Sequence, residues 1–180
     1  FHFLWILNSY SLIKIEINSS ILWAWLASAI AAIFLFVMGF CLSLSLQTSK
    51  RKYNPQRLLT ISLGAGMLSI LTFLNDPKTF IFFGILHHIT ITSLLLPLFS
   101  RAPTWIMILL TLLIFFSNIF VPASTIEYPL FWWIGFSSAS FSSIDYVPLI
   151  PWIGVSILGM ELGKYANKRS HISVIIILSI

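Results

Sequence analysis

Five ionisable side chains lie within or beside the long apolar stretches of this sequence. They are His2, His87, His88, Asp145 and Glu161. A histidine beside a carboxylate can move a proton near neutral pH, because the imidazole titrates in that range. The same groups could instead form hydrogen bonds that only hold helices together. These residues are therefore candidates both for catalysis and for packing.

The composition predicts that helices in a lipid bilayer hold these groups. Hydrophobic residues make up 58% of the chain and charged residues only 8%, whereas soluble domains carry roughly 25% charged residues. So few charges cannot cover a surface exposed to water. Since a membrane-crossing helix needs about 20 apolar residues, the chain is predicted to be all-α. It would form a polytopic transmembrane helix bundle, as a single domain over residues 1–180.

Polar and proline-containing breaks divide the apolar residues into five full spans and two truncated ones. The full spans are predicted at Ile21–Leu46, Leu58–Leu74, Phe80–Ser100, Thr104–Val121 and Leu149–Ala166. The truncated spans are Phe1–Leu7 and Ile172–Ile180. We therefore interpret the chain as an internal piece of a longer protein.

The basic residues fix an orientation for these spans. Most of them lie in the segments 48–57 and 164–171, or at Arg101. Cytoplasmic loops carry an excess of Lys and Arg, so these segments are predicted to face the cytoplasm. The aromatic-rich loop 123–148 would then lie outside, either as a surface anchor or as a lid over a site. Because this topology accounts for the net charge of +5, no nucleic-acid partner is predicted.

In this topology three of the ionisable groups fall at a similar depth. With a rise of 1.5 Å per residue, His2 and His87 would lie roughly 9 and 10 Å below the outer boundary. Asp145 directly precedes the last full span. His88 would point about 100° away from His87 on the same helix, while Thr90 shares the face of His87. We therefore expect His2, His87 and Asp145 to form a shared site in the outer third of the membrane.

The last full span carries two further features near its cytoplasmic end. Glu161 precedes Lys164 by three residues, a spacing typical of a local ion pair on a helix. Gly159 and Gly163 form a Gly-x-x-x-Gly element, which lets helix backbones approach closely in lipid. This element favours packing within the chain, and a homodimer is the alternative.

Three strings in the sequence carry a resemblance to a known family. They are FLFVMGFCLSLS at Phe34–Ser45, FGILHHI at Phe83–Ile89 and DYVPLIPWIGV at Asp145–Val155, with His2 and Phe3 before them. In this order, they resemble the bacterial membrane proteins related to heparan-α-glucosaminide N-acetyltransferase, over nearly the whole chain. The resemblance implies a multi-pass protein of the bacterial cytoplasmic (inner) membrane.

The resemblance also implies an activity. Acetyl-coenzyme A would be the co-substrate on the cytoplasmic side, and the acetyl group would reach an amine or hydroxyl of a sugar or glycolipid acceptor at the outer face. No metal is expected. The sequence thus predicts a membrane-bound acetyltransferase in the lipid bilayer.

The candidate residues take roles in that reaction. His2 or His87 would be the general base, and Asp145 would orient the histidine or the acceptor. Trp152 could pack against a sugar ring, and Thr90 is expected to contact the acceptor beside His87. The residues expected to meet the phosphates of coenzyme A are Arg57, Arg101 and Lys164.

Two other functions remain open at this point. The first is a non-enzymatic transporter or lipid-handling bundle, because Pro97, Pro122 and Pro151 near span ends would suit broken or moving helices. The second is a b-type haem held between His2 and His87. Turnover of acetyl-coenzyme A separates the acetyltransferase from both.

Overall fold

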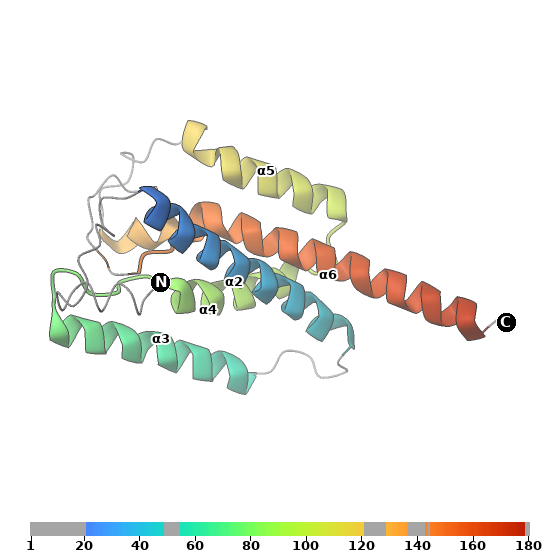
Figure 1. The fold of residues 1–180 in the computed structure, drawn as a ribbon, viewed down its shortest axis with the longest axis horizontal. Coiled ribbons are helices and arrows are strands. Elements are labelled where there is room, and N and C mark those ends of the chain that lie inside the picture. Colours follow the sequence, from blue (N-terminus) through green and yellow to red (C-terminus); the bar gives the residue numbers. More distant parts are fainter. Residues whose placement is uncertain (1–20, 49–54, 121–128, 137–142, 144, 179–180) are drawn as a thin grey trace. The chain divides into compact units, whose positions relative to one another are not determined.

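The described residues of this computed structural model are all helix or connecting segments, without a strand among them. They are residues 21–48, 55–120, 129–136, 143 and 145–178 (Figure 1), and the side chains at 48, 118, 120, 129–131 and 167–178 are not described. The elements are α2 (Ile21–Thr48), α3 (Pro55–Asn75), α4 (Ile85–Leu95), η1 (Leu96–Phe99), α5 (Thr104–Phe120), η3 (Pro129–Ile134) and α6 (Leu149–Leu178). The prediction of an all-α fold is confirmed for this part of the chain.

The chain divides into two compact units, Phe1–Phe34 and Leu35–Ile180. In the first unit, the described residues form the first half of α2, where Ile21, Leu22 and Trp25 expose most of their side chains. The second unit holds the rest of α2 and all later elements. Both units thus leave apolar side chains uncovered, as expected of helices that face lipid.

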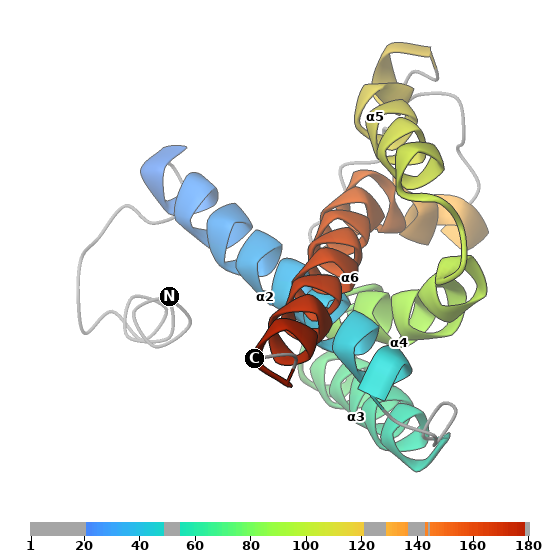
Figure 2. The same ribbon diagram turned by 90° about the vertical axis from the view of Figure 1, so that its right-hand side faces the viewer.

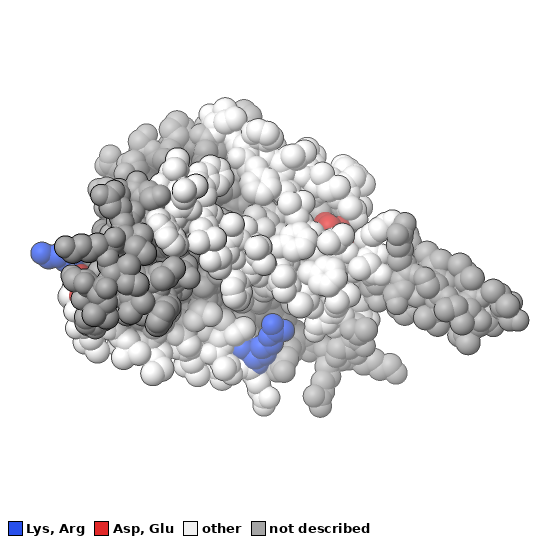
Figure 3. All heavy atoms as spheres, viewed as in Figure 1, with Lys and Arg blue, Asp and Glu red and all other residues white. Residues whose placement is uncertain are grey.

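Two described helices are long and apolar enough to cross a membrane. They are α2, over Ile21–Gln47, and α3, over Pro55–Asn75, and they match the first two predicted spans. The apolar helices Ile85–Phe99 and Thr104–Ser117 are shorter. The visible face carries few charged atoms among the described residues (Figure 3). Two spans are therefore supported, and a bundle of five remains a prediction.

The prediction of a helical span over Phe80–Ser100 is wrong for its first five residues. The segment 80–84 is irregular, and α4 begins only at Ile85. Groups outside the helix satisfy the backbone of this segment, because Ile81 N donates to Thr72 Oγ1 at 3.1 Å and Phe80 O accepts from Ser143 Oγ at 3.0 Å. Backbone groups that already have such partners do not need helical hydrogen bonds.

The predicted loops are shorter than expected. The segment 164–171 is helical, because α6 continues to Leu178 and no glycine or proline interrupts it there. Residues 55–57 belong to α3, whose first residue Pro55 is tolerated in a first helical turn. The predicted loop 123–148 contains the short helix η3, and its remaining residues lie partly outside the described ones.

The core of the second unit lies where η1, α5 and α6 meet. Leu96, Met107, Ile157 and Met160 are almost fully buried there. α5 runs alongside α6, and α4 also packs against it, as Figure 2 shows in a view close to the axis of α6. This core holds α4 against α6, so that His87 of α4 lies near Asp145, which precedes α6.

Glycines bring α2 and α6 into close contact within the second unit. A side chain added at Gly159 would collide with the carbonyl of Phe36, and one at Gly39 would collide with that of Ser156. A Cβ at Gly163 would lie 2.8 Å from Ser43 Cβ and 2.9 Å from Phe40 O. The Gly159-x-x-x-Gly163 element therefore packs within the chain, as predicted.

Candidate functional site

His87 and Asp145 meet at the N-terminal end of α4. The backbone N–H of Gly84, the residue before the helix, donates to His87 Nδ1 at 3.3 Å. The N–H of Ile85, the first helical residue, donates to Asp145 Oδ2 at 3.0 Å. Both side chains thus cap N–H groups that have no partner within a helix. The structure brings these two predicted site residues together, while His2 lies outside the described residues.

The segment around Asp145 is attached to α4 at several points. Val147 N donates to Phe83 O at 3.0 Å, and Ser143 Oγ donates to Phe80 O at 3.0 Å. Gly84 leaves the space that the carboxylate occupies, since a Cβ there would press against Asp145 Oδ2. The sequence FGILHH therefore places its glycine where a side chain would displace the Asp145 carboxylate.

Ser69 of α3 completes the surroundings of His87. Its hydroxyl donates to Ile81 O at 2.6 Å, and the same oxygen lies 3.2 Å from His87 Nε2. Sequence reasoning missed Ser69, because α3 carries several similar hydroxyl groups and nothing in their spacing selects one. The contact depends on the irregular segment 80–84, which turns the first residues of α4 back toward α3.

Aromatic rings surround the same end of α4. The Phe83 ring lies 5.7 Å from that of His87 and 6.0 Å from that of Trp133. Tyr146 donates its hydroxyl to Trp132 O at 2.6 Å. A tyrosine hydroxyl is protonated near neutral pH, and partial burial raises the pKa of Tyr146 further. Part of the predicted outer loop is thus packed beside the candidate site.

His88 has different surroundings from its neighbour. Its side chain is completely buried, and the carbonyls of Val147 and Pro148 face its ring. Neither ring nitrogen is within hydrogen-bonding geometry of a described group. His87, by contrast, is only partly buried. This divergence agrees with the expectation that His88 points away from the face of His87.

The residues expected to bind the acceptor are Thr90 and Trp152. Thr90 donates its hydroxyl to Leu86 O of its own helix at 2.9 Å. Trp152 lies partly buried in the first turns of α6. Among the described residues, no hydrogen bond or ring contact joins either of them to His87 or Asp145. Their roles stay predictions.

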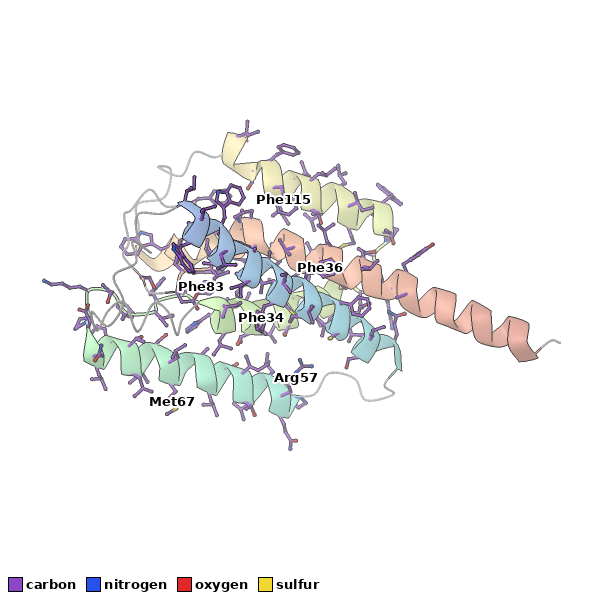
Figure 4. All side chains as sticks on the ribbon, in the orientation of Figure 1. Phe34, Phe36, Arg57, Met67, Phe83 and Phe115 are labelled. Atoms are coloured by element: carbon purple, nitrogen blue, oxygen red, sulfur yellow. The ribbon has the colours of Figure 1, made fainter. Side chains whose placement is uncertain are left out.

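The three basic residues do not converge on one cavity. Arg57 borders a cavity of about 60 Å³ between the second half of α2, α3 and α4, together with Ser45 and Ser93. Figure 4 shows Arg57 at the opposite end of the helices from Phe83. Arg101 is exposed in the turn before α5.

Lys164 is engaged within the protein. Its Nζ lies 2.6 Å from Glu161 Oε1 and also donates to Ala102 O at 3.3 Å. The predicted ion pair with Glu161 is therefore confirmed. Lys164 also borders a smaller cavity of about 30 Å³ with Ser43 and Ser100.

The described residues at the N-terminal end of α4 include the groups for proton transfer. No cluster of three or more His, Cys, Asp or Glu residues among the described residues could hold a metal ion. What the site offers is an imidazole and a nearby carboxylate at a helix end, in largely apolar surroundings. Such an arrangement can take up a proton from a nucleophile and return it to a leaving group.

Comparison with known proteins identifies the family. The family described as heparan-alpha-glucosaminide N-acetyltransferase, catalytic, matches residues 1–177. Searches of curated proteins and of solved structures found no match. The family match covers almost the entire sequence, including the strings that contain His87 and Asp145. The chain therefore belongs to the heparan-alpha-glucosaminide N-acetyltransferase catalytic family.

Proposed function

We propose that this protein is a membrane-bound acyltransferase that moves an acetyl group from acetyl-coenzyme A to an amine or hydroxyl of a sugar-type acceptor. Membership of an acetyltransferase family supports the reaction class, and the apolar helices α2 and α3 support a membrane location. The single observation that carries the site assignment is the convergence of His87 and Asp145 on adjacent N–H groups of α4.

In the proposed reaction His87 acts as the general base. The acceptor nitrogen or oxygen attacks the thioester carbonyl carbon of acetyl-coenzyme A, and its proton passes to the imidazole. The carbon–sulfur bond then breaks, and the imidazolium returns the proton to the leaving thiolate. The products are the acetylated acceptor and free coenzyme A, so atoms and charges balance.

Asp145 would act on the charged state of His87. A carboxylate beside an imidazolium stabilises it by direct charge attraction, which is strong where water is largely excluded. Asp145 is fixed by the N–H of Ile85, only one residue from the glycine that contacts His87. The carboxylate would therefore be in position before the proton moves.

The donor would approach from the other end of the helices. Arg57, Arg101 and Lys164 would meet its phosphates in the cytoplasm, and the acceptor would bind at the outer face beside His87. The cavities that Arg57 and Lys164 border, about 60 and 30 Å³, hold a few water molecules and not coenzyme A. Donor binding would thus require helix movement or the participation of residues outside the described ones.

The test is acceptor-dependent release of free thiol by the purified protein. The protein is reconstituted in liposomes with acetyl-coenzyme A outside and glucosamine inside, and both free thiol and N-acetylglucosamine are measured. Equal liposomes without glucosamine, and liposomes without protein, are the controls. The proposal predicts both products in equal amounts. Movement of glucosamine across the bilayer without acetylation would instead identify a transporter.

A further inference from the structure

We infer that Ser69 is a positioning residue that fixes the ring tautomer of His87 and so makes Nδ1 the atom that accepts the proton. The assignment of the tautomer rests on the contacts of His87 alone. Its consequence for catalysis rests on the proposed acetyl transfer. The two parts can therefore fail separately.

The proton of the Ser69 hydroxyl is already committed. Ser69 Oγ lies 2.6 Å from Ile81 O, and a carbonyl oxygen can only accept a hydrogen bond. Since a serine hydroxyl has one proton, it must point to Ile81. Toward His87 Nε2, at 3.2 Å, the serine oxygen can then only accept. Nε2 must therefore carry the hydrogen of the neutral ring.

The other ring nitrogen leads to the same tautomer independently. His87 Nδ1 lies 3.3 Å from the backbone nitrogen of Gly84, which can only donate. Nδ1 must therefore present its lone pair. Two partners on different segments, Ser69 in α3 and Gly84 before α4, thus agree on a ring with hydrogen at Nε2 and none at Nδ1.

This tautomer determines the side from which the acceptor approaches. The contact between Gly84 N and Nδ1 is long for a hydrogen bond, so Nδ1 is the nitrogen whose partner an incoming amine or hydroxyl would replace. Asp145 Oδ2 is bound to the N–H of the following residue. The acceptor would therefore deliver its proton at Nδ1, on the side of the ring where Asp145 stabilises the resulting charge.

Replacing Ser69 with Ala removes one of the two restraints. Nε2–H then has no acceptor, and only the long contact with Gly84 holds the ring. The ring becomes able to rotate and to exchange tautomers, so that Nδ1 carries the hydrogen for part of the time. Ser69→Thr keeps a hydroxyl at this position and should preserve the wild-type state.

Nitrogen NMR on histidine-labelled protein in nanodiscs tests the tautomer directly. The chain has four histidines, and His87→Gln identifies which signals belong to His87. At about pH 8, above the ordinary histidine pKa, wild type and Ser69→Thr should show a single tautomer protonated at Nε2. Ser69→Ala should show both tautomers.

A matched control comes from the same helix. Ser62 precedes Ser69 by seven residues, and its hydroxyl donates within α3 to Leu58 O at 2.8 Å. Ser62→Ala should leave the signals of His87 and the turnover unchanged. Ser69→Ala should lower kcat about tenfold, a fraction of the 10²–10⁴ that a general base contributes, with little change in KM for acetyl-coenzyme A. Ser69→Thr should restore most of the rate.

Two results would overturn the inference. One is a wild-type His87 protonated at Nδ1, and the other is a Ser69→Ala protein whose His87 signals match wild type, whatever its rate. If the wild-type protein has the expected tautomer but no acetyl transfer with any sugar acceptor, the proposed function fails and the assignment of the tautomer stands.

Discussion

Two groups of polar side chains among the described residues of this protein are built in different ways. At the N-terminal end of α4, His87 and Asp145 meet Ser69 and Gly84, residues from three separate parts of the chain. In α6, Glu161 and Lys164 lie three residues apart on one helix. The first group exists only once the fold has formed, whereas the second forms wherever α6 is helical.

The two groups also differ in how completely their polar atoms are hydrogen-bonded. Each ring nitrogen of His87 has a partner, and Asp145 Oδ2 accepts from Ile85 N. In the Glu161–Lys164 pair, Glu161 Oε2 is buried without a described hydrogen-bond partner. A group assembled from distant segments, with its ring oriented by contacts at both nitrogens, suits proton transfer because a reacting group must be held in position. A local pair mainly neutralises a charge that would be costly to bury alone.

Among the variants of the group at α4 that keep His87 and Asp145, Gly84→Ala should reduce activity most. The new Cβ would press against Asp145 Oδ2 and lie 2.9 Å from Ile81 Cγ2, so the carboxylate must move away from α4. A shift of about 1 Å at a reacting group can cost roughly 100-fold in rate, and we expect a loss of that size in thiol release.

Gly66→Ala in α3 is the control for this substitution. A Cβ at Gly66 would meet nothing within 4 Å, and alanine favours a helix over glycine by up to about 1 kcal/mol. Turnover should stay at the wild-type level and the melting temperature should stay equal or rise. Equal rates for the two alanine variants would show that the position of Asp145 does not matter.

Substitutions in the Glu161–Lys164 pair should change the stability of the protein. Lys164→Met leaves the Glu161 carboxylate buried without its cation, which should cost about 2 kcal/mol, below the usual value for a fully buried pair because Lys164 is partly exposed. The double variant Glu161→Gln/Lys164→Met removes both charges and should recover most of that loss. Thermal unfolding of the purified protein measures both.

The same double variant examines the proposed contact with coenzyme A. If Lys164 binds a phosphate of the donor, KM for acetyl-coenzyme A rises in the double variant even though its melting temperature is restored. An unchanged KM in a stable double variant would leave Lys164 with a purely structural role.

The smallest expected effect concerns the turn that connects α3 to the segment before α4. The Thr79 hydroxyl and the Lys78 backbone N–H bind the Asp76 carboxylate, at 2.7 and 3.0 Å, and hold its pKa below the ordinary value of 3.8. A pKa lowered by folding adds stability that is complete above the unfolded value and is lost as the pH falls through the folded one. Asp76→Asn should therefore lower the melting temperature slightly at pH 7 and flatten its decline below about pH 4, so that the two proteins converge in acid. Parallel declines for both proteins would contradict this.

The helices could be predicted where apolar runs end in strong breaks. α2 and α3 follow the predicted spans to within a few residues, because Pro55 and the Asn75-Asp76-Pro77 turn limit α3. The segment 80–84 could not be predicted, since its apolar residues suit a helix. Its conformation is decided by hydrogen bonds to Thr72 and Ser143, which are distant in sequence.

Some residues of the candidate site could likewise be predicted from the sequence, and others could not. His87 and Asp145 could be found because an ionisable group in an apolar stretch is costly and because the two share a predicted depth. Ser69 could not, since a hydroxyl in a helix usually bonds to its own backbone, as Ser62 does. Charge and a shared cytoplasmic position predict one site for Arg57 and Lys164, whereas packing places them beside different cavities.

The most direct measurement compares wild type with His87→Ala, using His88→Ala, His2→Ala and Ser62→Ala beside it. Acceptor-dependent consumption of acetyl-coenzyme A is normalised to monodisperse protein, so that a loss of folded molecules does not count as a loss of chemistry. We expect His87→Ala to lose 10²–10⁴-fold in turnover while staying folded, because its side chain is only partly buried. The His88→Ala variant should instead have a lower yield and a lower melting temperature, because His88 is completely buried. Turnover near the wild-type level in His87→Ala would contradict the assignment of His87 as the general base.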